Sequence, residues 1–134
     1  MAIVRFDPFR GLAALQGSLR GDGGWVPAVD IYESADRALV IKAELPEMTR
    51  EAISVTVEHG TLTISGERVR PADVKREDYR RVERAYGRFS RRFSLPPSVD
   101  SAKVEADYKD GVLNVRLPLR EAAKPRNVPV AAAS

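Results

Sequence analysis

The stretch VEADYKDGVLNVRLP, residues 104–118, decides the fold of this chain. Apolar side chains stand at every second position on both sides of its centre: Val104, Ala106, Tyr108, Leu113, Val115 and Leu117. A period of two is typical of a strand with one buried face, and the residues KDG between the two runs are typical of a turn. The stretch therefore predicts two antiparallel strands, the second of which ends at Pro118.

The same alternation recurs upstream of this hairpin. The alternating residues are Val29 and Ile31; Leu39, Ile41, Ala43 and Leu45; Ile53, Val55 and Val57; Leu62 and Ile64; Phe89, Phe93 and Leu95. His59 and Gly60 are predicted to form a two-residue hairpin loop between two of these runs. Seven short strands with turn signals between them predict an all-β sandwich, and no helical period of useful length appears within residues 25–117.

Composition narrows the class of protein. The 134 residues are 43% hydrophobic, which suits one domain of about 90 to 110 residues with tails. The chain has no cysteine, which excludes disulfides, Cys-ligated zinc and thiol chemistry, so the fold must be held by packing alone. The sequence has neither a basic-then-apolar leader nor an apolar run of about 18 residues, so we expect a cytoplasmic protein that does not insert into membranes.

The first 24 residues differ in composition from the rest. Large apolar residues occur there at helix-like spacing, interrupted by Pro8, Gly11 and Gly17; they are Phe6, Phe9, Leu12, Leu15 and Leu19. We interpret residues 1–20 as a short, imperfect amphipathic arm, and Gly21–Gly24 as a flexible linker. The arm is a candidate client-binding surface, with packing inside an oligomer as the alternative role.

The interval from Glu67 to Tyr86 is much longer than a usual connection between strands. Residues 78–83, DYRRVE, are compatible with a strand, and Tyr79 and Val82 are their only sizeable apolar side chains. Such a segment can pair with another sheet edge while it stays mostly solvated. The candidate interface residues are Asp78, Tyr79, Arg80, Arg81, Val82 and Glu83.

Arg91 alternates with Phe89 and Phe93, so the period of two directs its guanidinium toward the apolar side of the strand. A buried arginine is costly unless it is paired or hydrogen-bonded. We expect a specific partner, either a carboxylate such as Asp78 or Glu83 or backbone carbonyls, which a second chain could supply. A bulge that turns Arg91 outward is the alternative.

The C-terminal tail carries two valines around a proline, Val128, Pro129 and Val130, in a segment too polar to join a core. An extended segment with apolar side chains at i and i+2 can place one face in a groove beside a sheet. The proline fixes φ and lowers the entropic cost of ordering. We therefore interpret these residues as a latch between copies of the chain, with an unstructured tail as the alternative.

These motifs resemble the small heat-shock proteins of the α-crystallin (Hsp20) family, of bacterial type. The resemblance rests on WVPAVDIYE (residues 25–33), ELP (44–46), TLTISGER (61–68), YRRVERAYGRFSRRFSLP (79–96), VDSAKVEADYKDGVLNVRLP (99–118) and the Val-Pro-Val of the tail. It implies an immunoglobulin-like sandwich, the α-crystallin domain, over residues 25–119, between an N-terminal arm and linker over 1–24 and a tail over 120–134.

The resemblance also implies an activity and a set of partners. The activity is that of an ATP-independent holdase that keeps partly unfolded client proteins from aggregating, with ATP-dependent refolding chaperones acting downstream. Residues 78–83 would be exchanged between protomers to build a dimer, and Arg91 would lie near that interface. The tail would dock in a groove of a neighbouring dimer, beside the strands that contain Val55, Val57, Val104 and Ala106.

The chain departs from the family pattern at several positions. Glu47 stands where a glycine is common after ELP, so we expect the turn there to differ from the family's. Leu119 stands where a lysine is common after the final LP, and the tail carries valines in place of isoleucines. Each such valine lacks one methylene, about 0.8 kcal/mol if the side chain is buried, so we expect easier subunit exchange than an Ile-Pro-Ile tail would allow.

No catalytic, cofactor-binding or metal-binding constellation is expected. His59 is the single histidine and falls in a predicted turn. Glu105 and Asp107 share a strand face, which alternation explains as a solvated face better than as a catalytic pair. Gly21–Gly24 has neither the preceding strand nor the lysine-bearing helix of a phosphate loop. The sequence therefore does not predict an enzyme.

Two other functions compete with the holdase. A nucleic-acid-binding module could use the basic residues Arg80, Arg81, Arg84, Arg88, Arg91 and Arg92 with the aromatic residues Tyr79, Tyr86, Phe89 and Phe93. Three acidic residues, Glu77, Asp78 and Glu83, dilute that basic field, so no nucleic-acid partner is predicted. A monomeric co-chaperone adaptor is the second alternative, but it would need neither the long interval nor the Val-Pro-Val tail.

Overall fold

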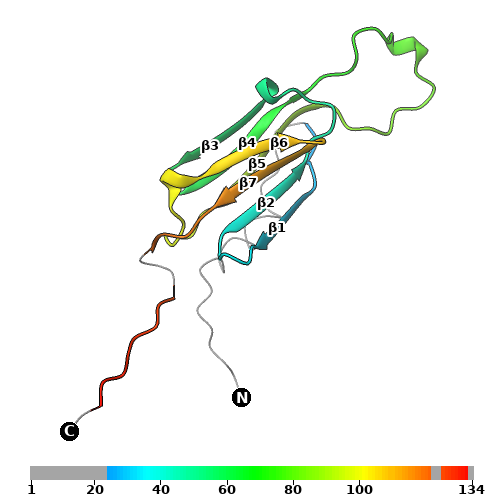
Figure 1. Ribbon diagram of the computed structural model, residues 1–134. Helices are drawn as coiled ribbons and strands as arrows, with labels where there is room; N and C mark the ends of the chain where they lie inside the picture. Colours follow the sequence, from blue (N-terminus) through cyan, green and yellow to red (C-terminus); the bar gives the residue numbers. More distant parts are fainter. Residues whose placement is uncertain (1–23, 122–124, 133–134) are drawn as a thin grey trace, which may run out of the picture.

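A computed structural model describes residues 24–121 and 125–132 of the chain. Figure 1 shows two layers of strands, with one long loop at one end and the tail leaving from the other. The strands are β1 (Val29–Glu33), β2 (Leu39–Glu44), β3 (Ile53–Glu58), β4 (Thr61–Arg68), β5 (Gly87–Ser94), β6 (Glu105–Lys109) and β7 (Val112–Leu117).

The strands form two antiparallel sheets, one in the order β1-β2-β7-β6 and the other in the order β3-β4-β5. The helical elements of the described residues are short 3-10 turns: η1 (Arg50–Ala52), η2 (Arg76–Asp78) and η3 (Ser101–Lys103). The prediction of an all-β, immunoglobulin-like sandwich is therefore confirmed, and the alternating segments are the strands that the sequence predicts.

The core lies between the two sheets and is built from the alternating apolar residues. Ile41, Leu62, Ile64 and Phe93 are fully buried, and each faces the opposite sheet. Burying a side chain of this size stabilises the fold by about 1.5–3 kcal/mol. Because the side-chain period of a strand is two, a register slip of one residue would expose this whole set, so the pattern also fixes the register.

Two tight turns close the hairpins. His59 and Gly60 join β3 to β4 with φ values of 50° and 72°, and Asp110 and Gly111 join β6 to β7 with φ values of 54° and 77°. Two consecutive residues with positive φ are the requirement of a type I′ turn, whose twist matches that of the flanking strands. Both hairpin predictions are confirmed.

The turn after β2 keeps a left-handed residue although it lacks a glycine. Glu47 has a φ of 57°, a conformation that costs a residue with a Cβ roughly 1–2 kcal/mol. Neighbouring contacts hold the turn in place, because the Leu45 amide donates to the Gly111 carbonyl at 2.8 Å and the Met48 amide donates to the Tyr108 hydroxyl at 3.2 Å. The departure at Glu47 thus leaves the turn in the conformation that a glycine would favour.

Gly66 on β4 is predicted to be intolerant of any side chain. A Cβ there would lie 2.3 Å from the Ala52 carbonyl oxygen and 3.0 Å from the Phe89 ring. Gly66→Ala is therefore expected to lower the free energy of unfolding by about 1–3 kcal/mol, the usual cost of overpacking. Urea unfolding at a fixed protein concentration measures the change.

Gly60→Asn is the matched control, because nothing lies within 4 Å of its Cβ position and asparagine tolerates the φ of 72°. We expect this variant to lose at most about 1 kcal/mol. Equal stability of Gly66→Ala and wild type would contradict the close approach between β4 and the residue before β3.

A charged network closes the turn between β1 and β2. The Ser34 hydroxyl and the Arg116 guanidinium both donate to the Asp36 carboxylate, and together they lower the pKa of Asp36 from 3.8 to about 2. Because the folded-state pKa lies below the unfolded value, this carboxylate favours the fold above about pH 3.8 and loses its contribution as the pH falls toward about 2.

Asp36→Asn is expected to remove that part of the pH dependence. Unfolding by urea between pH 2 and 5, in the wild type and the variant, measures the difference in slope. Carboxyl chemical shifts in an NMR titration report the pKa of Asp36 directly. A midpoint near 3.8 for Asp36 in the folded protein would contradict the network.

Candidate functional site

An open groove runs between the edges of the two sheets. It has a volume of about 350 Å³ and lies where β3, the edge of the three-stranded sheet, approaches β6, an edge of the four-stranded sheet. Its apolar wall consists of Ile53, Val55, Ala106 and Leu113, and the residues Arg50, Asp107 and Tyr108 complete the lining. The groove thus offers apolar surface with charge at its margins.

The predicted groove residues divide into two pairs. Val55 and Ala106 meet in this groove. Val104 lines a neighbouring depression with Pro118, and Val57 and Val104 pack against the core as half-buried residues. Ile53 and Tyr108 were missed, although the alternation already placed them on the same strand faces as Val55 and Ala106.

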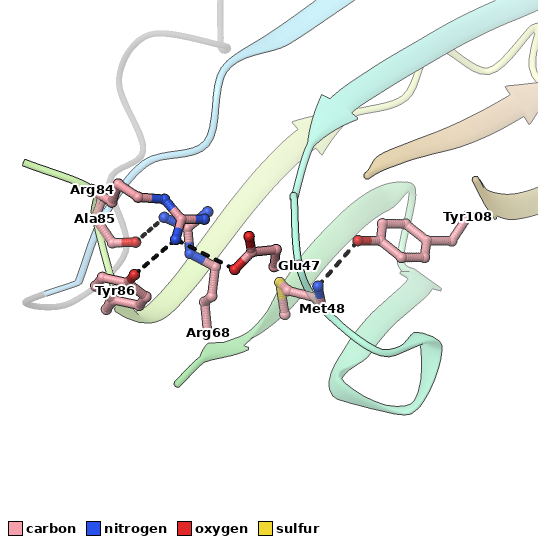
Figure 2. Close-up of polar contacts among 7 residues, drawn as sticks. All are labelled: Glu47, Met48, Arg68, Arg84, Ala85, Tyr86 and Tyr108. Carbon is pink, nitrogen blue, oxygen red and sulfur yellow. Dashed lines mark hydrogen bonds and ion pairs between the residues drawn. The ribbon is translucent and has the colours of Figure 1, made fainter. Parts of the chain in front are cut away.

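One end of the groove is held by Tyr108. Its hydroxyl accepts from the Met48 amide (Figure 2) and donates to the Leu45 carbonyl. These two hydrogen bonds connect β6 to the turn after β2. A wall fixed in this way loses little conformational freedom when it binds a segment, which favours binding.

The tail presents its valines to solvent. Residues 125–132 are extended and belong to neither sheet, and they run away from the sandwich in Figure 1. Val128 is 68% exposed and Val130 is 96% exposed. Two large apolar side chains on one extended face are therefore available to a partner.

The segment predicted to exchange, residues 78–83, lies in the loop that projects from the end of the sandwich between β4 and β5 (Figure 1). In the protomer Asp78 closes η2, and residues 79–83 belong to neither sheet. Val82 is 44% exposed, and the Tyr79 ring is half-buried beside the Arg70 guanidinium at 5.6 Å. The segment is thus presented away from its own sheets.

Arg91 points into the sandwich, as the alternation predicts. It is buried, and its Nη1 donates to the Pro27 carbonyl at 2.8 Å. Desolvation lowers the pKa of the guanidinium from its usual value. Of the partners that the sequence suggested, this contact is the backbone carbonyl, and it comes from the same chain.

A second arginine, Arg68 at the end of β4, is also buried, and the sequence pattern was not used to predict it. Its guanidinium lies 4.5 Å from the centre of the Trp25 ring and 5.0 Å from that of Tyr86, and it donates to the Ala85 carbonyl (Figure 2). The signal was present, because the period of two continues from Leu62 and Ile64 through Gly66 to Arg68. The side chain therefore faces inward at the base of the long loop.

The histidine and the two carboxylates singled out in the sequence lie on the surface. His59 is exposed beside Glu58, and Glu105 and Asp107 are exposed on β6. Across residues 24–121 and 125–132, no three histidine, aspartate or glutamate side chains form a group that could hold a metal ion. In the same residues, no helix has the length and apolar character that crossing a bilayer requires.

The phenylalanines of the basic and aromatic cluster belong to the core. Phe89 and Phe93 are only 2% and 0% exposed, and Arg91 is buried with them. Arg84 pairs with Glu47 at 3.3 Å and Arg81 pairs with Glu83 at 3.1 Å, which reduces the basic field. Stacking on nucleic-acid bases needs exposed rings, so these phenylalanines cannot supply it.

The fold and the groove define the protein as an immunoglobulin-like β-sandwich with an open edge and a free extended tail. The model of the Hsp20/alpha crystallin family matches residues 31–131, and the chain belongs to this family of small heat-shock proteins. The resemblance stated from the sequence is confirmed.

Relatives in several organisms agree with this placement. The chain is 37% identical to Spore protein SP21 of Stigmatella aurantiaca over 131 residues, which cover 96% of this chain and 76% of the relative. It is 41% identical to the 17.8 kDa class I heat shock protein of Arabidopsis thaliana over 122 residues, which cover 89% and 76%.

Solved structures share the fold as well. A small heat-shock protein from Xylella fastidiosa superimposes with a TM-score of 0.70 at 39% identity, covering 82% of this chain and 100% of that one. Heat shock protein 16.0 from Schizosaccharomyces pombe superimposes with a TM-score of 0.72 at 30% identity, covering 96% and 100%.

Proposed function

We propose that this protein is an ATP-independent holdase that assembles from strand-exchanged dimers into larger homo-oligomers. In this proposal it binds partly unfolded clients in the cytoplasm, performs no catalysis, and passes clients to ATP-dependent refolding chaperones. The proposal rests mainly on two apolar surfaces that one protomer leaves uncovered. They are the open groove at the sheet edge and the two exposed valines of the tail.

The tail of one copy would dock in the groove of another, because both present apolar side chains. Val128 and Val130 would fill the apolar wall formed by Ile53, Val55 and Ala106. Two buried valines contribute about 3–6 kcal/mol in total, against about 1–2 kcal/mol of backbone entropy for each residue that becomes ordered. A single tail is therefore a weak latch, and several tails per assembly gain affinity through avidity while each can still release.

The dimer uses a different edge. β6 borders the groove, which leaves β1 as the other edge of the four-stranded sheet for the segment at residues 78–83. Asp78, Tyr79, Arg80, Arg81, Val82 and Glu83 would then add a strand beside β1 of a partner. Arg91 supports this edge from inside, because it holds the Pro27 carbonyl two residues before β1 begins.

Clients would compete for the same kinds of surface. The arm residues Phe6, Phe9, Leu12, Leu15 and Leu19 lie outside the described residues, and their proposed role rests on their apolar character. The groove is the second proposed client surface. Apolar patches of this sort are normally covered by assembly, so release of a tail would expose them.

Light scattering of a thermolabile enzyme heated with and without this protein tests the activity. Without any nucleotide, we expect the protein to suppress scattering and to remain bound to the client in a soluble complex. An equal mass of an unrelated soluble protein is the control. If scattering in the presence of this protein matches that control over the whole range of ratios, the holdase proposal is wrong.

A further inference from the structure

The root of the N-terminal arm and the two ends of the long loop meet at one place in the fold. Gly24 and Trp25 are the first described residues after the arm, Arg68 ends β4 where the loop leaves, and Gly87 begins β5 where the loop returns. The Trp25 amide donates to the Arg88 carbonyl at 3.2 Å, and its indole Nε1 donates to the Gly87 carbonyl at 3.0 Å.

Packing fixes the arm root against β5. The Trp25 ring meets the Phe89 ring edge to face, with centroids 5.3 Å apart. At Gly24 the backbone passes so close to β5 that a Cβ would lie 1.4 Å from the Arg88 carbonyl oxygen. The chain can therefore enter the domain here only with its backbone pressed on the strand that receives the returning loop.

Arg68 connects this root to the loop. Its guanidinium contacts the Trp25 ring at 4.5 Å and the Tyr86 ring at 5.0 Å, and it donates to the Ala85 carbonyl. A planar guanidinium can contact two rings and a carbonyl together, whereas a lysine ammonium offers only a point charge. Arg84 makes a second connection at the end of the loop. Its Nη1 donates to the Tyr86 hydroxyl at 3.0 Å and to the Glu47 carboxylate at 3.3 Å (Figure 2).

Arg68 is buried with incomplete polar compensation. It is only 6% exposed, its Nε has no hydrogen-bond partner in the described structure, and within residues 24–121 and 125–132 no carboxylate pairs with it. A buried donor left unpaired is costly, and an apolar side chain of similar volume often replaces a buried charge without loss of stability. The contacts that Arg68 does make are with Trp25 at the arm root and with Ala85 and Tyr86, the two residues before the loop returns to β5.

We infer that Arg68 is a positioning residue that couples the N-terminal arm to the dimerisation loop. When the arm root is displaced, the Trp25 ring moves away from the Arg68 guanidinium. The contacts of Arg68 with Ala85 and Tyr86 then weaken, and residues 78–83 become less rigidly placed for pairing with a partner. Binding at the arm and exchange of subunits then become linked events, and linkage makes the effect reciprocal. This inference rests on the proposed strand exchange and names a way in which it is regulated.

The absence of cysteine makes a direct test possible. Two spin labels, at Thr56→Cys on the exposed face of β3 and Lys75→Cys in the loop, report the position of the loop relative to the sandwich. The labelled chain is diluted with unlabelled chain so that distances within one protomer are measured. Subunit exchange between fluorescently labelled pools is followed in parallel.

Arg68→Met is expected to broaden the distance distribution and to speed subunit exchange about fivefold or more, with little change in Tm. Arg92→Met, the same change at an exposed arginine of β5, is the control and should match wild type in both measurements. Arg68→Lys keeps the charge without the planar contacts and should change both readouts in the same direction as Arg68→Met.

Trp25→Leu tests the link to the arm. We expect it to broaden the same distribution, and the double variant with Arg68→Met to go no further than the larger single effect, because both act through one contact. An unchanged distribution in both Arg68 variants, or full additivity with Trp25→Leu, overturns the inference. A proline pair at Arg81 and Val82 decides separately whether residues 78–83 build the dimer, so a failure of strand exchange would be recognised as such.

Discussion

Replacing Val128 and Val130 together by serine is expected to break the large assembly down to dimers. The two side chains are 68% and 96% exposed in the protomer, so their loss should leave the stability of the sandwich within about 0.5 kcal/mol of wild type. Each valine is worth about 1.5–3 kcal/mol when it is buried, so each tail loses most of its gross attraction. Because assembly depends on many weak tails at once, the loss of binding energy at every tail adds up over the whole particle.

Light scattering coupled to size-exclusion chromatography measures the result. Ala131→Ser with Ala132→Ser is the control, since it makes two polar changes in the same exposed tail immediately after the latch. The control should retain the wild-type mass. A Val128→Ser, Val130→Ser protein that keeps the full oligomer mass at low micromolar concentration would contradict the role given to the tail.

Prolines at Arg81 and Val82 are expected to convert dimers into monomers. Amides of consecutive residues point to opposite sides of a strand, so one of the two prolines must remove a donor from any ladder that residues 78–83 form. The protomer loses little, since both residues are exposed and lie outside its own sheets. A lost ladder contact of about 1–3 kcal/mol weakens dimerisation roughly tenfold to a hundredfold at each exchanged segment.

A pair of prolines at Lys75 and Arg76 provides the control in the same loop. Lys75 already has a φ of −72°, and Arg76 is the first residue of η2, a position that suits proline. This control should dimerise like wild type, and analytical ultracentrifugation compares the two dissociation constants. Equal constants for both proline pairs would place the dimer interface outside residues 78–83.

The strands were predictable because apolar side chains recur at every second position along them and pack on one continuous core. Leu62 and Phe93 alternate with polar residues, whereas Ile41 follows the buried Val40, so the alternation is less regular in β2. The two type I′ turns were predictable for a related reason, since His59-Gly60 and Asp110-Gly111 place a glycine where the second positive φ is needed. The inward direction of Arg91 followed from the same rule.

The contacts that join distant segments could not be read from the pattern. Alternation shows that Arg91 faces inward, but the choice of the Pro27 carbonyl depends on where the chain enters the sandwich. Arg68 was overlooked because Gly66 interrupts the apolar run before it, and the rings of Trp25 and Tyr86 reach it only in the folded chain. The extent of the groove likewise depends on how the two sheet edges approach each other, which brings Leu113 of β7 into its lining.

In the proposed account, a single folded protomer is incomplete, and other copies of the chain fill its groove and pair with its β1 edge. Sedimentation of the native protein over a range of concentrations and temperatures tests it most directly. We expect particles built from an even number of 14.8 kDa chains, which release dimers on dilution or heating. A single species with the mass of one chain under all these conditions would contradict the account.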